Sequence, residues 1–144
     1  MGEEHRGSRV TFYVDASVPV AVRRALAEAR DDVCHAGQPG MPKESTLDVH
    51  WLKKAGEHDW VVLKRDKRIR KRPAEREALI EAGVRTFCLT GAGNYTRWEV
   101  LRLIAARWPK IEEVAATVDG PYVYSVTWGG VKALPLEVPE PVTA

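Results

Sequence analysis

Three aspartates, Asp15, Asp48 and Asp66, combine the side-chain chemistry and the sequence context of a divalent-metal site. Asp15 follows the apolar run 10–14 and Asp66 follows the apolar run 60–63, so each is expected near the end of a β-strand. Asp48 lies on the apolar face of a short predicted helix. Carboxylate oxygens suit Mg²⁺ or Mn²⁺, which activate water and neutralise charge on a phosphate under attack. The pattern therefore predicts metal-dependent hydrolysis of nucleic acid.

The elements that must position these aspartates alternate along the chain. Apolar periodicity predicts strands over residues 10–14, 33–36, 60–63 and 85–89, and helices over 18–29, 45–55, 74–82 and 96–108. This alternation predicts an α/β fold with a mainly parallel sheet, in which ligands bind at the carboxyl ends of the strands. Residues 122–127 and 131–136 flank Trp128-Gly129-Gly130 and predict a β-hairpin added at one edge.

Capping residues and apolar stripes set the expected helix boundaries. Ser17 is predicted to cap the first helix, with Pro19 in its first turn, and Ser45 to begin a capping box that includes Asp48. Thr96 is predicted to cap the fourth helix. The inward stripe expected for that helix, which Pro109 would end, consists of Trp98, Leu101, Ala105 and Trp108.

Length and composition indicate one globular domain. The 144 residues suffice for one core, which we expect over residues 10–136, with flexible tails at 1–9 and 137–144. No apolar run is long enough to span a membrane and the N-terminus lacks an apolar signal region, so we expect a cytoplasmic protein. Cys34 and Cys88 are interpreted as packed thiols.

The charge of the chain is unevenly distributed. Residues 64–76 hold eight basic and two acidic side chains, a net charge of +6, whereas the net charge of the whole chain is +2. Such a run can bind phosphates without reading sequence. The candidate RNA-binding residues are Arg65, Lys67, Arg68, Arg70 and Arg72. Trp128, beside a Gly-Gly turn, is a further candidate for a partner surface or for stacking on a base.

Three segments resemble the acidic motifs of the PIN-like domain family: residues 12–15, 47–52 and 60–67. The resemblance covers about residues 10–110 and is closest to the compact, VapC-type proteins of that family. It implies a three-layer PIN-like fold and an Mg²⁺- or Mn²⁺-dependent ribonuclease, commonly the toxin of a type II toxin-antitoxin pair. The implied metal-binding acids are Asp15, Asp48 and Asp66. The expected partners are an RNA substrate, an antitoxin protein and a second copy of the chain in a homodimer.

The sequence departs from the family pattern at two acidic positions. Larger PIN domains have another acid between the first two motifs, for which Glu44 is the candidate, and a fourth acid after the third motif, where this chain has the basic run 67–70. Asn94 is a candidate neutral ligand. Two other functions stay open: an inactive PIN-like module that binds RNA or protein, and an aspartyl-nucleophile phosphatase. The phosphatase would need an acid where Ser17 stands.

Overall fold

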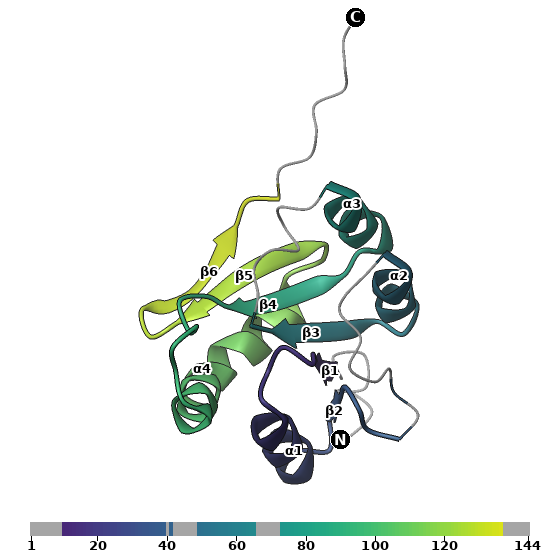
Figure 1. Cartoon of the computed structure of the whole chain (residues 1–144). Coiled ribbons are helices and arrows are strands. Elements are labelled where there is room, and N and C mark those ends of the chain that lie inside the picture. The colour runs from purple at the N-terminus through teal and green to yellow at the C-terminus, as the bar shows by residue number, and fades with distance from the viewer. Residues whose placement is uncertain (1–9, 40, 42–48, 66–72, 137–144) are drawn as a thin grey trace, which may run out of the picture.

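A six-stranded sheet forms the centre of the part of the chain that the structure describes (Figure 1). The structure is a computed structural model that describes residues 10–39, 41, 49–65 and 73–136. In sequence order the strands are β1 (Thr11–Val14), β2 (Val33–His35), β3 (Trp60–Lys64), β4 (Arg85–Leu89), β5 (Tyr122–Thr127) and β6 (Gly130–Leu134). Their order across the sheet is β2-β1-β3-β4-β5-β6.

All neighbouring strands are parallel except β5 and β6, which pair antiparallel. The carboxyl ends of β1 to β5 therefore meet at one edge of the sheet, which we call the carboxyl edge. The β5–β6 hairpin confirms the predicted hairpin, because β6 lies at the outer edge of the sheet and pairs only with β5 among the described strands.

Helices cover both faces of the sheet and make a three-layer α/β fold (Figure 1). They are α1 (Val20–Ala29), α2 (Val49–Glu57), α3 (Pro73–Ala82) and α4 (Arg97–Thr117). One core contains buried residues of α1 and α4, and the other contains buried residues of α2 and α3. This arrangement confirms the predicted fold class.

Side-chain alternation along the strands divides the interior into these two cores. In β1, Phe12 and Val14 pack toward α1 and α4, whereas Tyr13 packs toward α2 and α3. In β3, Leu63 belongs to the first core and Val62 to the second. Strands β1 and β3 are thus buried on both faces, which explains the apolar runs at these two positions of the sequence.

Helix α4 differs from its prediction in both phase and length. Its buried stripe consists of Val100, Leu103, Ile104, Trp108, Ile111, Val114 and Ala115. Trp98 is 63% exposed, so the prediction that it packs in the core was wrong. The predicted end at Pro109 was also wrong: the helix continues to Thr117, because Ile111 and Val114 extend the buried stripe while Pro109 lies on the exposed face.

The caps of two helices test two further predictions. Thr96 caps α4 as predicted: its hydroxyl accepts the backbone N–H of Glu99, whose carboxylate accepts the N–H of Thr96. The predicted cap of α1 was wrong, because Pro19 is the N-cap residue and Ser17 bonds elsewhere. The predicted capping box at Ser45 lies outside the described residues.

Two other sequence-based expectations concern the cysteines and the helices. Cys34 and Cys88 are both buried thiols, which confirms the prediction that they pack in the interior. In the described part of the chain, no helix has the length and apolar character needed to cross a membrane.

Candidate metal centre

Asp15 lies at the carboxyl edge between the ends of β2 and β3. Its backbone N–H donates to the carbonyl oxygen of Leu63 at 2.9 Å, so the β1–β3 ladder continues through this residue. On the other side, the N–H of Ala36 donates to the carbonyl oxygen of Val14 at 3.0 Å. Asp15 is only 4% exposed. A carboxylate at this depth needs hydrogen bonds or a cation to offset its desolvation.

Ser17 fixes one oxygen of the Asp15 carboxylate. Its hydroxyl donates to Oδ2 at 2.6 Å and its backbone N–H donates to the same oxygen at 3.0 Å. The hydroxyl oxygen also accepts the backbone N–H of Arg65 at 3.0 Å. One serine side chain therefore connects the acid after β1 to the backbone after β3.

Arg23 binds the loop between Asp15 and α1 through two hydrogen bonds. This residue is 5% exposed, and its guanidinium donates to the carbonyl oxygens of Ala16 at 3.0 Å and Val18 at 2.7 Å. These two bonds satisfy backbone carbonyls that face the interior, where an unpaired polar group is costly. Sequence reasoning missed Arg23, since an arginine on an amphipathic helix is usually solvated.

The second oxygen of Asp15 has no hydrogen-bond donor among the described residues. Oδ1 is buried and accepts no hydrogen bond from any of them. Oδ2, by contrast, already accepts two donors, both from Ser17. A buried carboxylate oxygen without a donor fits a hard cation such as Mg²⁺ or Mn²⁺.

The predicted site residues divide into those that the structure describes and those outside it. Asp48, Asp66, Glu44, Lys67, Arg68, Arg70 and Arg72 lie outside the described residues. Arg65 is half-buried directly after β3. Asn94 is exposed in the turn after β4, which a bond from the N–H of Tyr95 to the carbonyl oxygen of Ala92 closes. Among the described residues, no three His, Cys, Asp or Glu side chains group together as a metal site.

Two residues near the carboxyl edge have interior positions. Lys64, the first residue of the basic run, is 4% exposed, so it belongs to the interior rather than to a solvated basic surface. His35 is also buried, with Nδ1 2.7 Å from the carbonyl oxygen of Ala36.

The α/β fold, with an aspartate at the end of its first strand, agrees with the family that the comparison of sequences gives. The sequence profile of the PIN like domain matches residues 10–91, more than half of the chain, and the protein belongs to this family. A relative from Mycobacterium tuberculosis (strain ATCC 25618 / H37Rv) bears the name "Putative ribonuclease VapC45". It is 29% identical over 83 residues, which are 58% of this chain and 59% of the relative. No solved structure matches the chain.

Proposed function

We propose that this protein is a metal-dependent endoribonuclease of the VapC type and the toxin of a type II toxin-antitoxin pair. The observation that carries the proposal is the buried Oδ1 of Asp15, which lacks a donor among the described residues. Asp15 lies in the segment 12–15 that resembles the first acidic motif of PIN-like domains, within the residues that match the family. The ribonuclease name of the M. tuberculosis relative supports RNA as the substrate.

Asp15, Asp48 and Asp66 hold Mg²⁺ or Mn²⁺ in this proposal, with Glu44 and Asn94 as candidate further ligands. Asp15 continues the face of β1 on which Tyr13 packs with α2 and α3, and α2 begins at Val49, directly after Asp48 in sequence. Asp66 follows Arg65, whose N–H is bound to Ser17. A bound ion supplies a Lewis acid that activates water and neutralises charge at the phosphodiester.

The chain's own residues hold the site and the substrate. Ser17 orients Asp15 so that Oδ1 faces the cation. The RNA backbone is held by Arg65, Lys67, Arg68, Arg70 and Arg72 through phosphate contacts that do not depend on sequence. An antitoxin protein inhibits the enzyme in the cytoplasm.

A melting experiment tests the metal site. Mn²⁺ at 100 times its dissociation constant stabilises the folded state by about 2.7 kcal/mol, which is about 5–10 °C in Tm for a chain of this size. The rise should vanish with EDTA and in Asp15→Asn. Asp119→Asn removes an exposed carboxylate elsewhere and should keep the full rise. A rise of equal size in Asp15→Asn would refute the metal site.

Cleavage of single-stranded RNA tests the reaction. Wild type and Asp119→Asn should cut with Mn²⁺, and Asp15→Asn and Asp66→Asn should lose at least about 100-fold in rate, because a carboxylate ligand is lost. A wild-type protein that binds RNA but never cuts it, with every metal tried, would instead make the protein an inactive binding module.

A further inference from the structure

Two exposed tryptophans and an arginine lie in a row on the outer surface of α4 and the β5–β6 turn. Trp98 is 63% exposed and Trp128 is 41% exposed. Arg102 stands four residues after Trp98 on α4, so the two side chains are neighbours on one helix face. The Arg102 guanidinium carbon lies 5.6 Å from the centre of the Trp128 ring, a cation-π contact.

The turn that carries Trp128 is fixed to α4. The Arg107 guanidinium donates to the carbonyl oxygen of Thr127 at 3.0 Å and also to that of Trp128. The Gly129 N–H donates to the hydroxyl of Thr127 at 3.1 Å. The backbone at Trp128 is therefore held beside the helix by two bonds from Arg107, and Arg102 contacts its ring. An aromatic ring that is fixed before binding loses little entropy when a ligand stacks on it.

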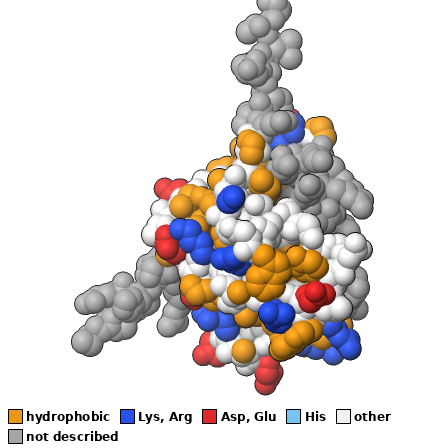
Figure 2. All heavy atoms as spheres, turned by 90° about the vertical axis from the view of Figure 1, so that its left-hand side faces the viewer, with side chains coloured by type: hydrophobic (Ala, Val, Ile, Leu, Met, Phe, Trp, Pro, Cys, Tyr) orange, Lys and Arg blue, Asp and Glu red, His pale blue; other side chains and the backbone are white. Residues whose placement is uncertain are grey.

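The surface around this row is basic. Residues 97–107 contain three arginines and one glutamate, a net charge of +2. Glu99 is engaged in the α4 capping box, and no described carboxylate forms an ion pair with Arg97, Arg102 or Arg107. Figure 2 shows hydrophobic side chains interspersed with Lys and Arg side chains on the face that carries α4 and the β5–β6 turn. Exposed aromatic rings beside arginines that form no ion pair with a described carboxylate are suited to bind a nucleic acid, which carries both phosphate charges and flat bases.

The row lies toward the same edge of the sheet as Asp15. Trp128 directly follows β5, and Trp98 is in the first turn of α4, which follows β4 through one loop. Two strands, β3 and β4, separate β1 from β5. Three spacings between strands amount to about 14 Å along the edge. Asp15 continues the face of β1 that packs with α2 and α3, whereas α4 covers the opposite face, so a single strand bound at Asp15 reaches the tryptophans by passing over the carboxyl edge.

We propose that Trp98, Arg102 and Trp128 form a platform on which bases of a single-stranded RNA stack beside the cleavage site. The inference rests on the proposed function for its choice of RNA. Aromatic side chains stack on any base, and arginine adds a cation-π contact and a phosphate partner. The platform thus supplies affinity without sequence preference.

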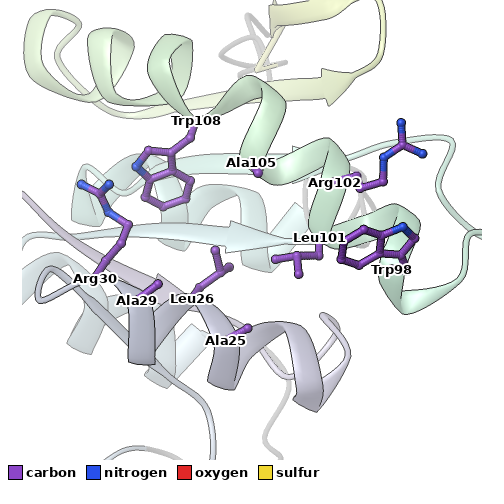
Figure 3. Close-up of a pocket in the computed structure, with 9 residues that line it drawn as sticks. All are labelled: Ala25, Leu26, Ala29, Arg30, Trp98, Leu101, Arg102, Ala105 and Trp108. Carbon is purple, nitrogen blue, oxygen red and sulfur yellow. The ribbon is translucent and has the colours of Figure 1, made fainter.

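A groove beside the platform suggests the rival occupant. It has a volume of about 490 Å³ and lies between α1 and α4, with Trp98 and Arg102 at its margin. In Figure 3, Ala25, Leu26 and Leu101 line its apolar part while Arg102 extends away from them. This apolar lining suits an apolar side chain of a protein partner more than an RNA base. The test must therefore separate stacking on the rings of Trp98 and Trp128 from burial in the groove.

RNA binding without divalent metal gives the test. The probe is a fluorescein-labelled, mixed-sequence, single-stranded RNA of twelve nucleotides in EDTA, and anisotropy gives Kd. Stacking energies imply that Trp98→Leu and Trp128→Leu each raise Kd about 5- to 100-fold. Trp98→Phe and Trp128→Phe should retain most of the affinity, because a phenyl ring also stacks. Both tryptophans are exposed, so circular dichroism should show every variant folded.

Paired charge variants on α4 provide the control. Arg102→Gln and Lys110→Gln each remove one positive charge from the same helix, and both residues are exposed. Only Arg102→Gln should lower the slope of log K against log salt, by about 0.7. Leu variants that bind RNA as well as the Phe variants, or wild type that does not bind the probe, would overturn the platform. Binding in EDTA without cleavage in Mn²⁺ would instead contradict the nuclease and leave the platform standing.

Discussion

Ser17 offers the sharpest test of how the candidate centre is held together. Its hydroxyl makes two bonds, one to Oδ2 of Asp15 at 2.6 Å and one from the N–H of Arg65 at 3.0 Å. A hydrogen bond to a charged group contributes about 1.5–3 kcal/mol, and the loss of the second bond leaves a backbone donor unpaired at a cost of about 1 kcal/mol. Ser17→Ala should therefore lower the free energy of unfolding by about 2–4 kcal/mol.

Thermal and urea unfolding measure this loss. At about 2–4 °C per kcal/mol, Tm should fall by about 5–15 °C. Ser17→Thr keeps a hydroxyl at the same carbon and should recover most of the stability. Ser125→Ala is the matched control, because that hydroxyl makes one long, exposed bond of 3.4 Å to the carbonyl oxygen of Lys132. It should change the free energy of unfolding by no more than about 0.5 kcal/mol.

Metal binding gives Ser17→Ala a second measurement. In Ser17→Ala the Asp15 carboxylate keeps the backbone N–H of residue 17 as a donor but loses the hydroxyl, so it is held less firmly and the rise in Tm with Mn²⁺ should be smaller than in wild type. Equal stabilities of Ser17→Ala and Ser125→Ala would refute the role of the Ser17 hydroxyl in joining β1 to β3. A full Mn²⁺ effect in a destabilised Ser17→Ala would limit that role to folding.

Three further predictions concern the rest of the fold. Burial raises the pKa of Cys34 to about 11, so Ellman's reagent at pH 8 should modify this thiol about 100-fold more slowly in the folded than in the unfolded protein. Because the pKa of Cys34 is higher in the folded than in the unfolded state, the free energy of unfolding should fall as pH rises from 9 toward 11. Thr96→Ala removes the α4 cap and should cost about 1 kcal/mol in urea unfolding, whereas an unchanged midpoint would contradict the cap. A Cβ at Gly56 would lie 2.5 Å from the carbonyl oxygen of Ala82, so Gly56→Ala should separate α2 from α3 and cost about 1–3 kcal/mol by the same measurement.

The central strands could be predicted from the sequence because their burial on both faces leaves continuous apolar runs. The predicted run 10–14 contains β1 (Thr11–Val14), and the predicted run 60–63 lies in β3 (Trp60–Lys64). Helix α4 was harder, because Trp98 suggested one apolar stripe while Val100, Leu103 and Ile104 define another, to which Trp108 also belongs. Periodicity alone does not distinguish the two stripes. The stripe that contains Val100, Leu103 and Ile104 is the buried one, because it packs against α1 and the sheet.

The candidate centre was predictable only where it depends on local sequence. An aspartate after an apolar run already placed Asp15 at the carboxyl edge, but the same local logic assigned Ser17 to a helix cap. The observed bond joins Ser17 to Arg65, 48 positions away, and forms only once β1 and β3 are paired. Because the Ser17 hydroxyl bonds to Asp15 and Arg65, α1 begins without a side-chain cap. Arg23 donates to two carbonyl oxygens of the loop that precedes the helix. Local sequence could not reveal that Ser17 holds the Asp15 carboxylate instead of capping α1, because its bond to Arg65 depends on the pairing of two strands that are far apart in the chain.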